Sequence, residues 1–254
     1  MGRRTDEALV EEAELLGAQR IFLLVSTTLR KNTHEIAEIE FALGARLAQT
    51  YDGIAAHAPR TDVLKETAAA RAAEADLIIT VGGGSVTDAG KVIALGLKHN
   101  ILTHEDFEGF YVYVDDNGET VAPVFDGPDI RVICCPTTLS VVEFNTMGGV
   151  TDDRENKKQG YTHRMMAPIA IVLDPALTLH TPEWLWHSTG VRAVDHALES
   201  LSSNHSSYFC DGVAESALRL LSQAMPEVKA DPANLDARLR CQIVAWQSMI
   251  PIIG

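Results

Sequence analysis

The chain has 254 residues, of which 46% are hydrophobic and 22% charged, an ordinary globular composition that excludes a disordered, collagen-like or coiled-coil protein. Lysine and arginine number 21 against 35 aspartates and glutamates, so the formal net charge is −14 and a nucleic-acid partner is not expected. A compact fold of this length buries enough apolar surface to be stable without disulfides or a structural metal.

Strand patterns recur through the first 175 residues. Continuous apolar runs predict strands that are buried on both faces, and one further run is weaker. The clear strands are expected over 21–25, 76–81, 130–135 and 169–173, and the weak one near 54–56.

Helical periodicity fills most of the sequence between these strands. Helices are expected over 5–16, 33–48, 62–74 with Thr61 as the cap, and from the glycines at 82–84 to about 98. Two polar segments are expected to form turns, 100–129 with a tight turn at 115–118, and 151–159. Alternation of strands and helices indicates a parallel sheet covered on both faces.

Beyond residue 175 the pattern becomes helical throughout, with a short helix opened by Pro182 and longer ones over 189–203, 208–225 and 233–250. We therefore predict an α/β dinucleotide-binding domain over 1–175, followed by an all-helical domain over 176–254. The apolar end at 249–254 leads us to expect that this helical domain is incomplete, because chain ends normally lie at the surface.

The four cysteines include an adjacent pair and two distant singles, with no CxxC motif, so free thiols in a reducing compartment are expected. The first residues carry charges but no apolar secretory segment, and no apolar run approaches the ~20 residues that cross a bilayer. We expect a cytoplasmic protein without a membrane partner.

The strongest local motif is Gly82–Ser85, which follows the strand at 76–81 and opens a helix. Glycines let a phosphate approach the backbone closely, and free N–H groups at a helix N-terminus bind anions. Asp88 and Lys91 follow one turn apart on one helix face. The segment fits neither the GxGxxG nor the P-loop pattern, and a tight turn without a ligand remains the alternative.

A second motif, Pro136–Ser140, follows the buried strand at 130–135 and supplies three hydroxyls. Ligands of open parallel sheets bind beyond the carboxyl ends of the strands, so these hydroxyls are candidates for contacts with a ribose or a nicotinamide amide. The alternative is a turn whose hydroxyls bond to their own backbone.

A third motif places Arg192 and His196 four residues apart on a helix, beside the pair Asp195 and Glu199. A histidine in this setting can donate a proton or bind a metal, whereas the alternative is an ion-paired helix face. The other histidines, at 34, 57, 99, 104, 163, 180, 187 and 205, have no metal-ligand spacing.

Together these segments resemble the iron-containing alcohol dehydrogenase family, the group III alcohol dehydrogenases with the dehydroquinate synthase-like fold. The matching segments, in order along the chain from about residue 9, are Gly82–Ser85 with Asp88 and Lys91, Pro136–Thr138, Pro168–Pro175 and Gly190–Glu199. The residues at 136–140 and 192–196 look most like the maleylacetate reductase branch.

The resemblance implies two domains with the active site in the cleft between them, and NAD or NADP as cofactor. It implies hydride transfer between the nicotinamide and a small alcohol, ketone or oxo-acid, and we expect a homo-oligomer. The cofactor-binding residues that it implies are Gly82, Gly83, Gly84, Ser85, Asp88, Lys91, Thr137, Thr138, Ser140 and Lys158.

Arg192 stands where metal-dependent members of the family have the aspartate ligand of an Asp-x-x-x-His motif, whereas His196 is retained. A guanidinium repels a divalent cation, so we expect no catalytic metal. We instead assign both residues to catalysis, with Arg192 binding a substrate carboxylate and His196 acting as an acid or orienting one.

Two further departures concern the cofactor. Val141 and Val142 stand where relatives usually have Gly-Ser, which would crowd the nicotinamide. Thr27 stands where many relatives place an aspartate that bonds the ribose 2′-OH, so NADPH should be accepted as well as NADH. The alternatives to an enzyme are a truncated, catalytically impaired relative that only binds nucleotide, and a subunit whose helical domain another chain completes.

Overall fold

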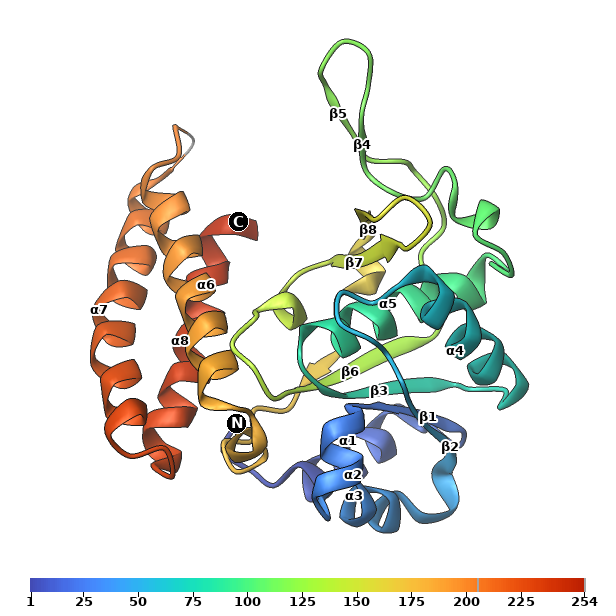
Figure 1. Cartoon of the computed structure of the whole chain (residues 1–254), viewed down its shortest axis with the longest axis horizontal. Coiled ribbons are helices and arrows are strands. Elements are labelled where there is room, and N and C mark those ends of the chain that lie inside the picture. The colour runs from blue at the N-terminus through green and yellow to red at the C-terminus, as the bar shows by residue number, and fades with distance from the viewer. Residues whose placement is uncertain (205, 254) are drawn as a thin grey trace.

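The computed structural model describes residues 1–204 and 206–253, so His205, to which the sequence assigns no special role, and Gly254 lie outside the described residues. Figure 1 shows an α/β part beside a group of long helices. Among the residues described, no helix has the length and apolar character needed to cross a membrane.

The centre of the α/β part is a five-stranded parallel sheet. In spatial order its strands are β2 (Leu47–Asp52), β1 (Ile21–Val25), β3 (Leu77–Gly82), β6 (Arg131–Pro136) and β9 (Ala170–Ile171). The chain order reverses between β1 and β3, because β2 lies on one side of β1 and β3 on the other. Such a switch point opens a crevice at the carboxyl ends of the strands, where ligands of these sheets bind.

Helices cover both faces of this sheet (Figure 1). One face carries α1 (Thr5–Leu16), α2 (Thr27–Asn32) and α3 (Glu35–Leu43), and the other carries α4 (Arg60–Ala72) and α5 (Gly84–Lys98). Successive side chains of β1 enter opposite cores, with Leu23 packed on the α1–α3 side and Phe22 and Leu24 on the α4–α5 side. All of β1 is therefore buried, which accounts for its continuous apolar run.

The predicted α/β sheet is confirmed, but one strand was misplaced. The strand expected near 54–56 is wrong, and β2 occupies 47–52, where the sequence predicted the end of a helix. Within the range predicted as one helix, the structure has α3 followed by a single 3₁₀ turn at Gly44–Arg46, and α2 precedes that range. β2 is an edge strand with no fully buried residue, so it lacks the apolar run that marks a central strand. Helix α4 begins after Pro59, and Thr61 lies inside it rather than capping it.

The charged segment predicted as a turn over 151–159 forms a turn only at residues 153–156, and its two ends are strands. It belongs to an antiparallel hairpin, β7 (Met147–Asp152) and β8 (Lys157–Thr162), which lies against α5. The hairpin contains Gly148, Gly149 and Gly160, which weaken any strand pattern in the sequence. A second hairpin, β4 (Tyr113–Val114) and β5 (Thr120–Val121), projects from the molecule and carries the expected turn at 115–118 (Figure 1).

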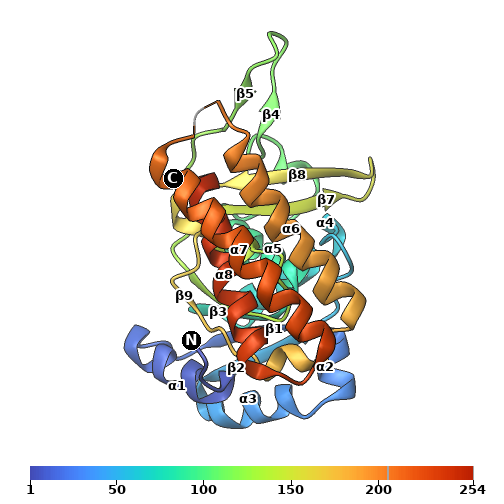
Figure 2. The ribbon, with the colours of Figure 1, turned by 90° about the vertical axis from the view of Figure 1, so that its left-hand side faces the viewer.

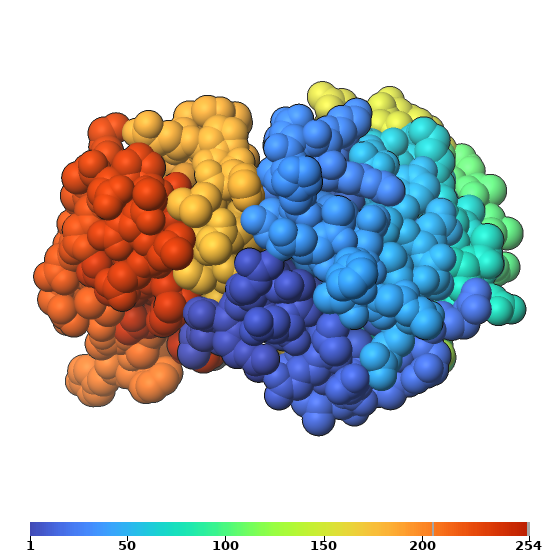
Figure 3. All heavy atoms as spheres, turned by 90° about the horizontal axis from the view of Figure 1, so that it is seen from below, coloured from blue at the N-terminus to red at the C-terminus, as the bar shows by residue number. Residues whose placement is uncertain are grey.

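The helical region consists of α6 (Glu183–Leu201), α7 (Tyr208–Ala230) and α8 (Leu235–Ile253), which pack side by side in Figure 2. The helix that Pro182 opens and the one expected from 189 are a single helix, α6. Leu139 and Val141, from the loop after β6, pack into the core of these helices. On the face in Figure 3 the helices and the N-terminal elements meet along a narrow seam. This arrangement supports a division at 175, which stays a prediction.

Candidate functional site

The glycine segment lies at the switch point of the sheet. Gly82 ends β3, and its backbone is close to Ser26 at the end of β1, since a Cβ at position 82 would lie 3.3 Å from the Ser26 Cβ. No side chain caps the N-terminus of α5, which begins at Gly84. The first N–H groups of this helix have no partner inside the helix, so they are suited to an anion.

The loop after β6 packs directly on these glycines. A Cβ at Gly83 would lie 3.2 Å from the Thr138 Cγ2, and one at Gly84 would lie 2.9 Å from the Ser140 Oγ. The Thr138 hydroxyl donates to Ser140 Oγ at 3.1 Å, and the Thr137 amide donates to the Gly82 carbonyl at 3.0 Å. Close packing therefore already requires the glycines, and their part in cofactor binding, like that of Ser85 and the hydroxyls, stays a prediction.

Lys91 and Asp88 extend from α5 towards different partners. The buried Lys91 ammonium donates to the carbonyls of Val142, Asn145 and Met147, the last two at 2.8 and 3.0 Å. It therefore holds the loop 142–147 rather than the glycine turn. Burial raises the pKa of Asp88, opposed by the amide of Gly149 and the charges of Lys158 and Lys91.

A cavity of about 520 Å³ lies between the α/β part and α6 and α8. It brings together residues that are far apart in the sequence. Its polar lining residues are Asp88, Ser140, Asn145, Thr146, Lys158, Thr162, Arg192, His196 and Glu199. The glycine turn does not line it but contacts Ser140, which does. Five of the predicted site residues thus border one cavity.

On α6, Arg192 and His196 point to the same cavity but differ in their surroundings. The exposed Arg192 guanidinium is paired with Asp195, with Nη1 and Oδ2 2.5 Å apart, so one side of the fork that the sequence suggested is already occupied. His196 is buried, with a relative exposure of 7%, and its Nδ1 has no hydrogen-bond partner. Burial, and then the charge of Arg192, lowers the pKa of His196. At neutral pH the imidazole is therefore uncharged.

Replacing Arg192 with methionine is expected to raise the pKa of His196 part of the way back towards its ordinary value of 6.5, because the repulsive charge is lost while burial remains. An NMR titration of the imidazole protons measures this shift. Arg219→Met removes the same charge from the exposed surface of α7 and serves as the control. An unchanged or lower His196 pKa in the Arg192 variant would show that the charge of Arg192 does not lower this pKa.

Val141 has a backbone conformation that its side chain disfavours. Its φ of 58° and ψ of 5° lie in the left-handed region, which a β-branched residue rarely adopts. Strain of this kind persists only where the surroundings impose it, and here the side chain is buried among α6–α8 while Lys91 holds the next carbonyl. Val141 therefore stands in place of the family's usual glycine at a position whose backbone conformation favours glycine.

The loop also contains a buried carboxyl group that the sequence did not single out. Glu143 is 2% exposed, its Oε2 has no hydrogen-bond partner, and burial raises its pKa to about 7. The positive charge of Lys91 lowers the pKa of Glu143, and the negative charge of Asp88 raises it. No local pattern separates this glutamate from a surface one, since its burial arises from the packing of the loop on α5.

A cluster that spacing could not reveal joins His104 to Asp152 and Asp153, with one donor atom of each lying within 4.8 Å of the others. The carboxylates already have partners. Arg60 and Arg154 donate to Asp152, and the amide and hydroxyl of Thr61 donate to Asp153. Hydrogen bonds from Arg154 chiefly hold the pKa of Asp152 at about 2. The cluster is thus an ion-pair network.

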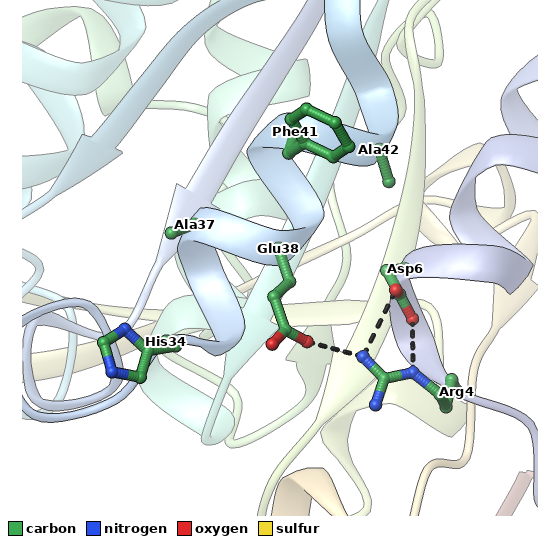
Figure 4. Close-up of a pocket in the computed structure, with 7 residues that line it drawn as sticks. All are labelled: Arg4, Asp6, His34, Ala37, Glu38, Phe41 and Ala42. Carbon is green, nitrogen blue, oxygen red and sulfur yellow. Dashed lines mark hydrogen bonds and ion pairs between the residues drawn. The ribbon is translucent and has the colours of Figure 1, made fainter.

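A larger depression, of about 700 Å³, lies on the opposite face of the sheet between α1 and α3 (Figure 4). It is open, and its charged groups pair with one another, since Arg4 contacts both Asp6 and Glu38. None of the residues predicted for the site lines it. We therefore place the candidate site in the smaller cavity beside His196.

Comparison with known proteins gives consistent results. The model of the family "Iron-containing alcohol dehydrogenase" matches residues 1–175. The dehydrogenase FUM7 of Gibberella moniliformis is 34% identical over 92% of this chain and 58% of its own length. Maleylacetate reductase 2 of Cupriavidus pinatubonensis is 28% identical over 96% of this chain and 58% of its own length.

Among solved structures, the sulfoacetaldehyde reductase of Bifidobacterium kashiwanohense, in complex with NAD⁺, superposes with a TM-score of 0.84. It is 20% identical, and the match covers 98% of this chain and 63% of that one, so it supports the fold. The chain spans about 58% of the length of the relatives named above. The family match covers more than half of the chain, and the chain therefore belongs to the iron-containing alcohol dehydrogenase family.

Proposed function

We propose that the protein is an NAD(P)-dependent oxidoreductase that transfers a hydride between a nicotinamide cofactor and a small alcohol, ketone or oxo-acid. The observation that carries this proposal is the uncapped N-terminus of α5 behind a glycine turn, placed at the switch point of the parallel sheet. Family membership supports it, as do relatives named as dehydrogenases and reductases.

The residues of the turn fit a dinucleotide. The segment Gly82–Ser85 would hold the pyrophosphate, because no side chain caps the N-terminus of α5 and a helix N-terminus favours negative charge. Thr137, Thr138 and Ser140 would line the ribose and nicotinamide side. A bound nicotinamide would supply the hydride. The chain's own residues would orient the substrate and exclude water.

On the substrate side, His196 would contact the reacting group and a cation of the cavity would contact a carboxylate, which favours an oxo-acid similar to maleylacetate. The proposal includes no metal, because Arg192 stands at the position of a family ligand and is itself bound to Asp195. Iron above background in protein purified without added metal would contradict this part. A homo-oligomer also remains a proposal, which a measurement of molecular mass in solution tests.

We expect NADH and NADPH to bind with dissociation constants in the micromolar range, measured by nicotinamide fluorescence. NADH should bind no more than ~100-fold more tightly than NADPH, since no carboxylate at Thr27 repels the 2′-phosphate. Gly84→Ala is expected to weaken both about 10-fold or more, because its methyl would collide with Ser140 and displace the loop after β6. Gly212→Ala, with no atom within 4 Å of the new methyl, is the control.

The second candidate is a relative that binds nucleotide without turnover. Two observations favour it: the pairing of Arg192 with Asp195, and the strained Val141 at the border of the cavity. Reduction of maleylacetate or a simple ketone by NAD(P)H separates the two candidates. Tight cofactor binding without turnover would support the second one, and absence of binding would contradict both.

A further inference from the structure

Two lysines flank Asp88, and their hydrogen bonding differs sharply. Lys91 is fully buried and its ammonium is saturated by backbone carbonyls of the loop 142–147. Lys158, on β8, is more than half exposed, and among the described residues its ammonium pairs with Asp88 alone. Its Nζ lies 3.8 Å from the Asp88 Oδ2, which is an ion pair but too long for a hydrogen bond. The donors of Lys158 are therefore free to bind a ligand.

Gly149 makes room for this ammonium. A Cβ at position 149 would lie 2.5 Å from the Lys158 Cε, 3.1 Å from its Nζ and 3.2 Å from the Asp88 Oδ2. Lys158 is paired with Thr151 across the hairpin, and Gly149 lies two residues before Thr151 on the same face of β7. The backbone at Gly149 is not left-handed, so its conformation does not require glycine. The missing side chain instead lets Lys158 lie across β7 and reach Asp88.

The cavity offers a second strong cation, Arg192, but Asp195 already occupies it at 2.5 Å. Lys158, in contrast, is held only by a long ion pair to Asp88, which is itself 5% exposed. Within the described lining of the cavity, Lys158 is thus the strong cation best able to accept an added anion. An ammonium is a compact charge whose three donors rotate to suit a carboxylate.

We propose that Lys158 binds the carboxylate of an oxo-acid substrate, and that Gly149 and Asp88 position its ammonium for this purpose. The proposal rests on the proposed function for the identity of the substrate. It assigns to Lys158 the part that the sequence suggested for Arg192, in place of the cofactor contact that the family resemblance implies for Lys158. It also makes Gly149 a positioning residue, because its absent side chain determines where the ammonium lies.

Binding of succinate, measured by calorimetry without cofactor, tests the proposal with a stable dicarboxylate. Lys158→Met is expected to weaken binding about 10- to 100-fold, the usual effect of losing a charge-assisted hydrogen bond. Gly149→Ala should weaken it to a similar extent by displacing the ammonium, and Lys158→Arg should restore part of it. Lys157→Met removes the same charge from the opposite face of β8 and should leave succinate binding unchanged.

The double variant Gly149→Ala with Lys158→Met separates positioning from general damage. If Gly149 acts only through Lys158, the double variant binds succinate as Lys158→Met does. The proposal is overturned if wild-type protein does not bind succinate, if Gly149→Ala binds it normally, or if Lys158→Met weakens NADH instead. Failure of NADH to bind wild-type protein would overturn the proposed function, while the succinate series would still decide the role of Lys158.

Discussion

Replacing Arg60 with methionine is expected to lower the free energy of unfolding by about 3–5 kcal/mol, the usual cost of removing one partner from a buried ion pair. Arg60 is fully buried, and its Nη1 donates to the Asp152 Oδ2 at 2.8 Å. Its Nη2 donates to the Gln159 Oε1 at 2.5 Å and to the Tyr161 hydroxyl at 3.0 Å. Methionine fills the space of the stem but removes the buried charge and the hydrogen bonds that the guanidinium donates to these oxygens.

Urea unfolding measures this loss as a lower midpoint with an unchanged slope. Arg154→Met is the matched control, because Arg154 also pairs with Asp152, at 3.1 Å, but its side chain is 44% exposed. Because the Arg154 end of this pair faces solvent and Arg60 would still pair with Asp152, the control should lose less stability. Equal losses in the two variants would show that the buried network is not the cause.

The same substitution connects stability to the site. Arg60 belongs to α4, whereas Asp152 and Gln159 lie on β7 and β8, so the guanidinium fastens the hairpin to the α/β part. Lys158 is carried by that hairpin. Faster hydrogen exchange of the β7–β8 amides in Arg60→Met, with unchanged exchange in β1, would show that the network holds this element in particular.

The elements predicted correctly from the sequence are those whose signal is local. β3, the glycine turn and α5 form one continuous stretch in which a buried strand, a tight turn and an amphipathic helix each leave a pattern. The parallel sheet follows from the repetition of such stretches. The convergence of Ser140, Lys158 and His196 on one cavity was expected from the family resemblance, since no spacing along the chain encodes it.

The mispredicted elements depend on contacts between distant residues. β2 is polar because it lies at an edge of the sheet. On β7, Gly148 lies close to α5 and Gly149 lies against the side chain of Lys158, so neither position has room for a side chain. A Cβ at Gly148 would lie 2.8 Å from the Val92 Cγ2, a contact that appears only when the hairpin meets the helix. The pairing of Arg192 with Asp195 agrees with the ion-paired helix face that the sequence left as an alternative, since residues three apart share a helix face.

Glu66→Gln is expected to raise the free energy of unfolding by about 3 kcal/mol at pH 7, and by little near pH 4.5. Glu66 is 1% exposed in α4, and neither carboxyl oxygen has a hydrogen-bond partner. Burial, followed by the charges of Asp62 and Asp52, raises its pKa from 4.5 to about 9. The folded protein therefore keeps this proton up to about pH 9, whereas the unfolded chain loses it near pH 4.5.

Between these two values the unfolded state binds fewer protons, so stability falls as pH rises, by up to about 1.4 kcal/mol per pH unit from this group. Glutamine has nearly the same shape and no proton to lose, so the variant should lack this slope. Its melting temperature should exceed that of the wild type by roughly 6–12 °C at pH 7. Glu215→Gln, on the exposed surface of α7, should keep the wild-type slope. An equally steep fall in Glu66→Gln would mean that Glu66 is ionised in the folded protein, and that its buried oxygens are solvated after all.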